Sequence, residues 1–107
     1  MNPTILPNTD PNLRLIVATW DLAAQCVLME TKPIIAWWIA PYRQPEPICL
    51  TTLRGTAWGL EDEQTGCVEI PDDGFHYRDE AKRLLQEKAR MVAVMAQRKA
   101  DETAKEV

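Results

Sequence analysis

The densest group of chemistry-bearing side chains in this sequence is acidic, with six carboxylates inside residues 61–73. They are Glu61, Asp62, Glu63, Glu69, Asp72 and Asp73. A cluster of this kind can attract a basic surface of another protein. It can equally form a solvated tip whose charges protect an edge strand from aggregation. The carboxylates lack the spacing of a calcium-binding loop, so the segment predicts an interaction patch or a solvated tip and no metal site.

Thiol chemistry is the second possibility. The three cysteines are odd in number, widely spaced and without a Cys-x-x-Cys pair: Cys26, Cys49 and Cys67. That usage is typical of reduced thiols in the cytoplasm. A cysteine nucleophile needs a nearby base, which His76 could supply to Cys67, with Asp72 or Asp73 as the third member. Any chain with three cysteines and one histidine offers such a combination, so the sequence favours a cysteine enzyme least.

Other catalytic and cofactor sites have little support in the sequence. A zinc site from Cys49, Cys67 and His76 would lack any known ligand spacing. The chain contains no serine, and its four glycines form neither a dinucleotide-binding nor a phosphate-binding loop. We therefore expect a non-catalytic protein without a metal or cofactor.

Charge is unevenly distributed along the 107 residues, whose formal net charge is −4. Residues 1–76 hold four Lys or Arg against ten Asp or Glu, whereas residues 77–107 hold eight against six. An acidic body repels phosphate backbones, which leaves nucleic-acid binding by the C-terminal segment as an alternative. The basic residues that would carry it are Arg78, Lys82, Arg83 and Arg90. The N-terminus lacks a secretory signal pattern and no apolar run reaches the ~20 residues of a membrane span, so we expect a cytoplasmic protein.

The elements before residue 48 are predicted from proline positions and apolar patterns. Prolines at positions 3, 7 and 11 predict an extended arm over residues 1–10. Asp10 and Pro11 are typical of a helix start, which predicts a helix over 11–29 with two apolar stripes that touch two surfaces. A strand over 13–20 is the alternative. Residues 34–40 predict a strand in which Trp37 and Trp38 point to opposite faces, so both faces of the sheet need a cover, which two flanking helices could provide.

The remaining elements complete an α+β fold. A proline-rich loop over 41–47 is followed by strands at 48–54, 56–62 and 67–70, with a tight turn at 63–66. With residues 34–40 they predict a four-stranded antiparallel meander, in which Val68 and Ile70 join Trp58 and Leu60 on one face. A long helix follows over 77–107. The expected organisation is a single domain over 1–107, made of the arm, a helix-plus-sheet body over 11–76 and this helix.

The long helix carries more apolar surface than one sheet needs. Met91, Val92 and Met95 lie beyond Lys88, which interrupts the apolar stripe, and they predict a contact between two copies of the chain. The polar end beyond Met95 should project or fray.

Taken together, these features predict a protein-interaction module that binds another protein with a basic surface. The candidate contacts are the six carboxylates together with Tyr42 and Arg43 in the proline-rich loop. A small accessory or inhibitory protein of a phage or other mobile element would fit this description. The alternative is a small nucleic-acid-associated regulator.

Overall fold

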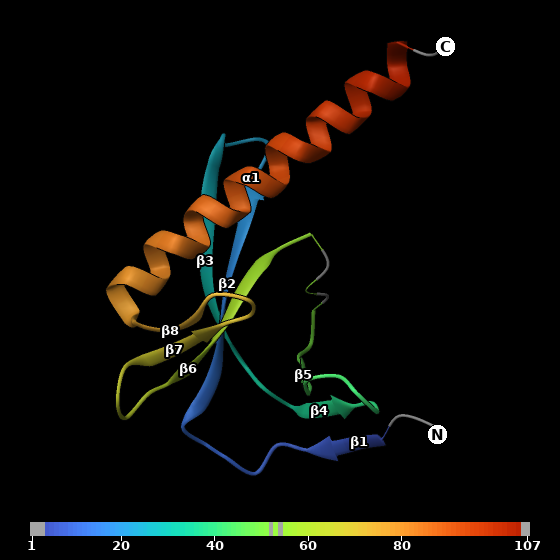
Figure 1. The fold of residues 1–107 in the computed structure, drawn as a ribbon. Helices are drawn as coiled ribbons and strands as arrows, with labels where there is room; N and C mark the ends of the chain where they lie inside the picture. Colours follow the sequence, from blue (N-terminus) through green and yellow to red (C-terminus); the bar gives the residue numbers. More distant parts are fainter. Residues whose placement is uncertain (1–3, 52, 54, 106–107) are drawn as a thin grey trace.

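The computed structural model describes residues 4–51, 53 and 55–105, and in that part it contains two antiparallel sheets and one helix (Figure 1). The small sheet has the strand order β1-β4-β5 and the large sheet the order β3-β2-β6-β7-β8. The elements are β1 Thr4–Pro7, β2 Leu13–Asp21, β3 Cys26–Pro33, β4 Ala36–Ile39, β5 Glu46–Ile48, β6 Ala57–Asp62, β7 Cys67–Ile70, β8 Gly74–Tyr77 and α1 Arg78–Lys105. The predicted N-terminal helix and four-stranded meander are therefore both wrong.

The predicted helix over 11–29 is replaced by the hairpin of β2 and β3. Its turn, Leu22–Gln25, is held by Asp21, whose Oδ1 accepts a hydrogen bond from the backbone N–H of Ala23 at 3.0 Å. Gln25 closes the turn with a φ of 55°. Asp10, expected as a helix cap, instead accepts a hydrogen bond from the Asn12 N–H at 2.9 Å in a local turn.

Strand β2 is the centre of the fold because both of its faces are buried. Ile16 and Ala18 belong to the core beneath α1, whereas Leu15 and Val17 belong to a second core with Ile34. Successive strand residues point to opposite faces, so a strand covered on both sides lacks the usual alternation of apolar and polar residues. The predicted helix with two apolar stripes is therefore wrong, and the two cores are reached by the two faces of one strand.

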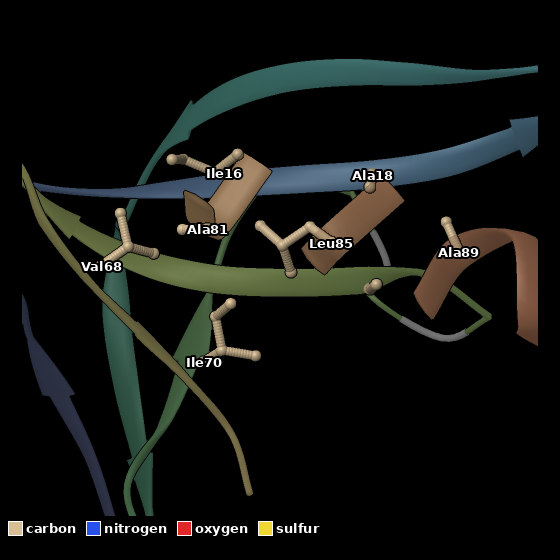
Figure 2. Packing of buried hydrophobic residues seen from close by; sticks show 8 residues of the cluster. Ile16, Ala18, Val68, Ile70, Ala81, Leu85 and Ala89 are labelled. Carbon is tan, nitrogen blue, oxygen red and sulfur yellow. The ribbon is translucent and has the colours of Figure 1, made fainter. Parts of the chain in front are cut away.

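Helix α1 docks on one face of the large sheet through a narrow stripe (Figure 1). Ala81, Leu85 and Ala89, spaced four residues apart, are buried against residues of β2, β6 and β7 (Figure 2). The small alanines bring the helix backbone close to the strands, while the larger Leu85 lies near the middle of the cluster that includes Val68 and Ile70 (Figure 2). Docking extends to the half-buried Ala93, and the described side chains beyond it are exposed.

The register between β6 and β7 differs from the expected one. Leu60 lies opposite Glu69 and Glu61 opposite Val68, so Val68 and Ile70 face α1 and not the side of Trp58 and Leu60. Gly59 makes this possible, because a Cβ there would lie 2.8 Å from Cγ1 of Val68. Trp58 and Leu60 instead pack against the second core on the opposite face.

The small sheet contacts the second face of the large one through Trp37 of β4. It uses β1, which occupies part of the arm expected over residues 1–10 and pairs with β4. The strand predicted over 34–40 is the shorter β4, and its partner β5 ends where the predicted strand over 48–54 would begin. Thr52 and Arg54 of that predicted strand lie outside the described residues, as do positions 1–3, 106 and 107. At the other end of the chain, His76 and Tyr77 belong to the unpredicted β8, and the helix begins at Arg78.

The tryptophan pair shows how the two sheets are layered. Trp37 packs on the second core and its Nε1 donates to Oδ1 of Asn8 at 3.2 Å. Trp38 lies on the opposite face of the small sheet, across from Ile5, whose side chain is 65% exposed. A sheet, not a helix, therefore covers Trp37.

No helix among residues 4–51, 53 and 55–105 has an apolar stretch long enough for a membrane span.

Candidate functional site

The predicted acidic patch is divided between the two faces of the large sheet, and Glu61 lies on the helix side. Its side chain is 2% exposed, and Oε1 accepts a hydrogen bond from Nε of Arg14 at 2.5 Å. Nε of Arg78 lies 3.4 Å from Oε2. Two guanidinium groups therefore neutralise this buried carboxylate, so Glu61 holds the start of α1 to the sheet and is not available to a partner.

Three other carboxylates of the predicted patch are also engaged within the chain. Glu63 accepts a hydrogen bond from Arg14 at 2.6 Å, and Oδ1 of Asp62 accepts one from the Gln64 N–H at 2.9 Å in the hairpin turn. Asp73 lies 2.8 Å from Nζ of Lys88. The hydrogen bond from Lys88 holds the pKa of Asp73 below its ordinary value.

The remaining two carboxylates, Glu69 and Asp72, line a cleft on the face opposite α1. The cleft has a volume of about 430 Å³. Leu60, Glu69 and Phe75 lie side by side across β6, β7 and β8, so their side chains share this face. Asp72 reaches the rim from the β7–β8 turn, where its φ is 67°. Glu46, which the sequence did not single out, enters from the small sheet.

Trp58 is the common wall of this cleft and of two neighbouring hollows. One, of about 410 Å³, runs along β5 past Pro47 and Cys49. The other, of about 310 Å³, lies where α1 leaves the sheet, beside Met91 and Met95. We call the cleft of about 430 Å³ the Trp58 cleft. Its walls are Trp58, Leu60, Glu69, Asp72, Phe75, Glu46 and Arg43.

The Trp58 cleft combines aromatic walls with an acidic rim. Among the described residues that line it, the carboxylates Glu46, Glu69 and Asp72 outnumber the cations, of which there is one, Arg43. Phe75 of β8 is 70% exposed, although its side chain is large and apolar. Indole and phenyl faces attract cations, and nearby carboxylates add to that attraction. This arrangement can hold an ammonium or guanidinium group whose aliphatic stem packs on Trp58.

The two candidates in the proline-rich loop have different positions. Arg43 lines the Trp58 cleft. Tyr42 does not line it; its side chain is fully exposed on a backbone with a φ of 62°. The structure therefore brings together Arg43, Glu69 and Asp72 from the predicted set, and it separates Glu61, Asp62, Glu63, Asp73 and Tyr42 from them.

Trp58, Phe75 and Glu46 are the site residues that the sequence reasoning missed. Alternation in residues 57–62 places Trp58 and Leu60 on one face, opposite Ala57 and Gly59. The small residues on that second face were the signal that a helix packs there, which would have left the Trp58 face for other contacts.

The thiol and zinc sites considered from the sequence are not assembled. Cys67 lies across from Tyr77, and Val68 from His76, so the side chains of Cys67 and His76 point to opposite faces of the sheet. The His76 ring lies 3.0 Å from the carbonyl oxygen of Asp73. Among the described residues, no group of three potential metal ligands comes together.

The basic residues proposed for nucleic-acid contacts are partly neutralised within the chain. Arg78 lies on Glu61. Arg83 binds Glu80 at 2.5 Å and Glu87 at 2.8 Å, and these contacts raise the pKa of Arg83 and lower that of Glu80. A phosphate backbone would have to compete with these carboxylates.

Comparison of the chain with models of protein families, with curated proteins and with solved structures found no match.

Proposed function

We propose that this chain is a non-catalytic protein-binding module that holds a basic side chain of a partner protein in the Trp58 cleft. The observation that supports the proposal is the combination of Trp58 and the exposed Phe75 with Glu69 and Asp72 on one face of the sheet. These carboxylates have no ion-pair partner among the described residues, unlike Glu61, Glu63 and Asp73.

The size and composition of the cleft fit a single inserted side chain with its neighbouring backbone. A volume of about 430 Å³ lies at the low end of ligand-binding pockets, at roughly 300–1,000 Å³. Arginine suits the site better than lysine, because a planar guanidinium can stack on Trp58 while it donates to a carboxylate. Cytoplasmic localisation belongs to the same proposal, and it is supported by three cysteines that form no disulfide in the structure.

The proposal is tested with short synthetic peptides. The probe is a fluorescein-labelled glycine hexapeptide with Arg-Leu at its centre, compared with the same peptide containing Gln-Leu, in a fluorescence anisotropy titration at low salt. We expect the arginine peptide to bind more tightly and its binding to weaken with added salt. In a two-dimensional NMR spectrum, the shifted signals should include the indole N–H of Trp58.

Two double variants each remove two negative charges, one from the cleft and the other from a distant part of the surface. In E69Q/D72N the cleft loses two carboxylates, each worth ~0.7 kcal/mol at a partly exposed site, so affinity should fall about tenfold. In the control, E80Q/E87Q, the same two charges are lost from the exposed side of α1, and affinity should change little. Equal binding of the arginine and glutamine peptides, or equal weakening in both variants, would contradict the proposal.

A further inference from the structure

The C-terminal half of α1 extends beyond the sheet (Figure 1), and apolar side chains in it are exposed. Met91 is 63% exposed, Met95 65% and Val92 39%. Beyond Met95 the same side of the helix carries charged residues in place of apolar ones. The side chains three, four and seven positions from Met95 in either direction share this side of the helix; they are Lys88, Met91, Val92, Arg98, Lys99 and Glu102.

This stripe has the spacing of a helix–helix seam, and its charges set the orientation of a second helix. Lys88 and Glu102 are equally far from Met95 on its two sides. In a parallel pair, Lys88 would face Lys88 and Glu102 would face Glu102. In an antiparallel pair centred on Met95, each Lys88 faces the partner's Glu102, and opposite charges meet at both ends of the seam.

We propose that two copies of this chain pair through the Lys88–Glu102 seam of α1, antiparallel and centred on Met95. Each Met95 lies at the two-fold axis and contacts its symmetry mate, as an isologous interface requires. The aliphatic stems of Arg98 and Lys99 cover Val92 and Met91 of the other copy. Lys88 can accept this role because an ammonium has three donors, and its bond to Asp73 uses only one.

The hollow where α1 leaves the sheet gives the second helix a place to rest. It measures about 310 Å³ and is bounded by Trp58 and Pro71 on the sheet and by Lys88, Met91 and Met95 on the helix. The partner's Arg98–Glu102 segment would lie along this hollow, so each helix end packs against the other copy's sheet. This interface shares the wall Trp58 with the Trp58 cleft but uses neither Glu69 nor Asp72, and it does not depend on the proposed function.

The test compares two neighbouring substitutions by sedimentation equilibrium of the whole chain. Met95→Glu places two carboxylates together at the two-fold axis and should raise the dimer dissociation constant by about tenfold or more. Val94→Glu is the control, because Val94 is 45% exposed but lies about 100° around the helix from Met95. It should change the constant by less than about twofold. A wild-type chain that sediments as a monomer at the highest concentration tested overturns the proposal, as does equal weakening by the two substitutions.

The orientation of the helices is tested by charge exchange. Lys88→Glu and Glu102→Lys should each weaken self-association, since each creates two like-charge contacts. Mixing the two variants should restore wild-type affinity, because both contacts of the mixed dimer then join opposite charges. A mixed dimer that is much tighter than the wild type indicates parallel helices and overturns the antiparallel arrangement. The E69Q/D72N variant should dimerise normally, which separates this test from that of the peptide-binding cleft.

Discussion

Replacing Arg14 should reveal how much stability the buried carboxylate of Glu61 requires. Arg14→Met keeps the aliphatic stem but removes the guanidinium that lies 2.5 Å from Oε1. Of these two guanidinium partners Glu61 then keeps Arg78, whose Nε is 3.4 Å away. Breaking a buried ion pair on one side costs ~3–5 kcal/mol, and water can reach the vacated position because the Arg14 side chain is 37% exposed. We therefore expect a loss near the lower limit, about 3 kcal/mol of unfolding free energy.

The assay is urea unfolding at neutral pH, followed by tryptophan fluorescence, with an unchanged dependence on urea concentration. Arg83→Met is the matched control, because Arg83 also binds two carboxylates, but both are exposed. Its unfolding midpoint should hardly move. The double variant R14M/E61L removes the buried carboxylate as well and should recover part of the loss; the recovery is incomplete because Arg78 then loses its carboxylate partner. Equal shifts for the Arg14 and Arg83 variants would refute the reasoning, and so would a double variant no more stable than R14M.

Two further predictions concern the large sheet and its turn. Gly59→Ala should lower the unfolding free energy by about 1–3 kcal/mol, because the new Cβ would lie 2.8 Å from Cγ1 of Val68. Val68→Ala in the same chain should relieve part of the added cost in thermal unfolding, and simple additivity would count against the proposed contact. Asp73→Asn should reduce stability above pH 3.8, the ordinary pKa of this carboxyl, because Lys88 lowers the pKa in the folded state. The difference from the wild type should disappear as the pH falls through that lower value, and a difference that persists in acid would contradict the Lys88 contact.

The β6–β7 hairpin could be predicted because its residues carry short-range sequence patterns. The segment from Thr56 to Ile70 was recognised as two strands around a turn, and the structure has β6, β7 and a left-handed Gly66 there. Alternation within β6 and a glycine at the turn are short-range features, so they do not depend on the rest of the chain.

The β2–β3 hairpin could not be recognised in the same way. Its turn, Leu22–Gln25, contains two alanines and no glycine or Asn-Gly pair, so the segment resembles a helix. The flanking β2 is buried on both faces, which removes the alternation that identifies a strand. Only the tertiary structure, with α1 on one side and the small sheet on the other, decides between the two states.

The candidate site was predicted only in part for a related reason. Proximity in sequence grouped Glu61 with Glu69, but a strand places neighbouring side chains on opposite faces. The antiparallel register then placed Glu61 beneath the helix and Glu69 at the cleft. Arg43 was identified for its loop, and its position beside Glu69 depends on the packing of the small sheet.

The position of β2 between β3 and β6 has a consequence for how fast this chain can fold. The β2–β3 hairpin joins neighbours in sequence and can form within microseconds. The β2–β6 ladder instead joins Ala18 to Ala57, which closes a loop of about forty residues that contains β4 and β5. The helix core needs the β2–β6 ladder, since its buried strand residues come from β2, β6 and β7. Closure of that loop is therefore the expected rate-limiting step, and the early hairpin would wait with its two apolar faces exposed to aggregation.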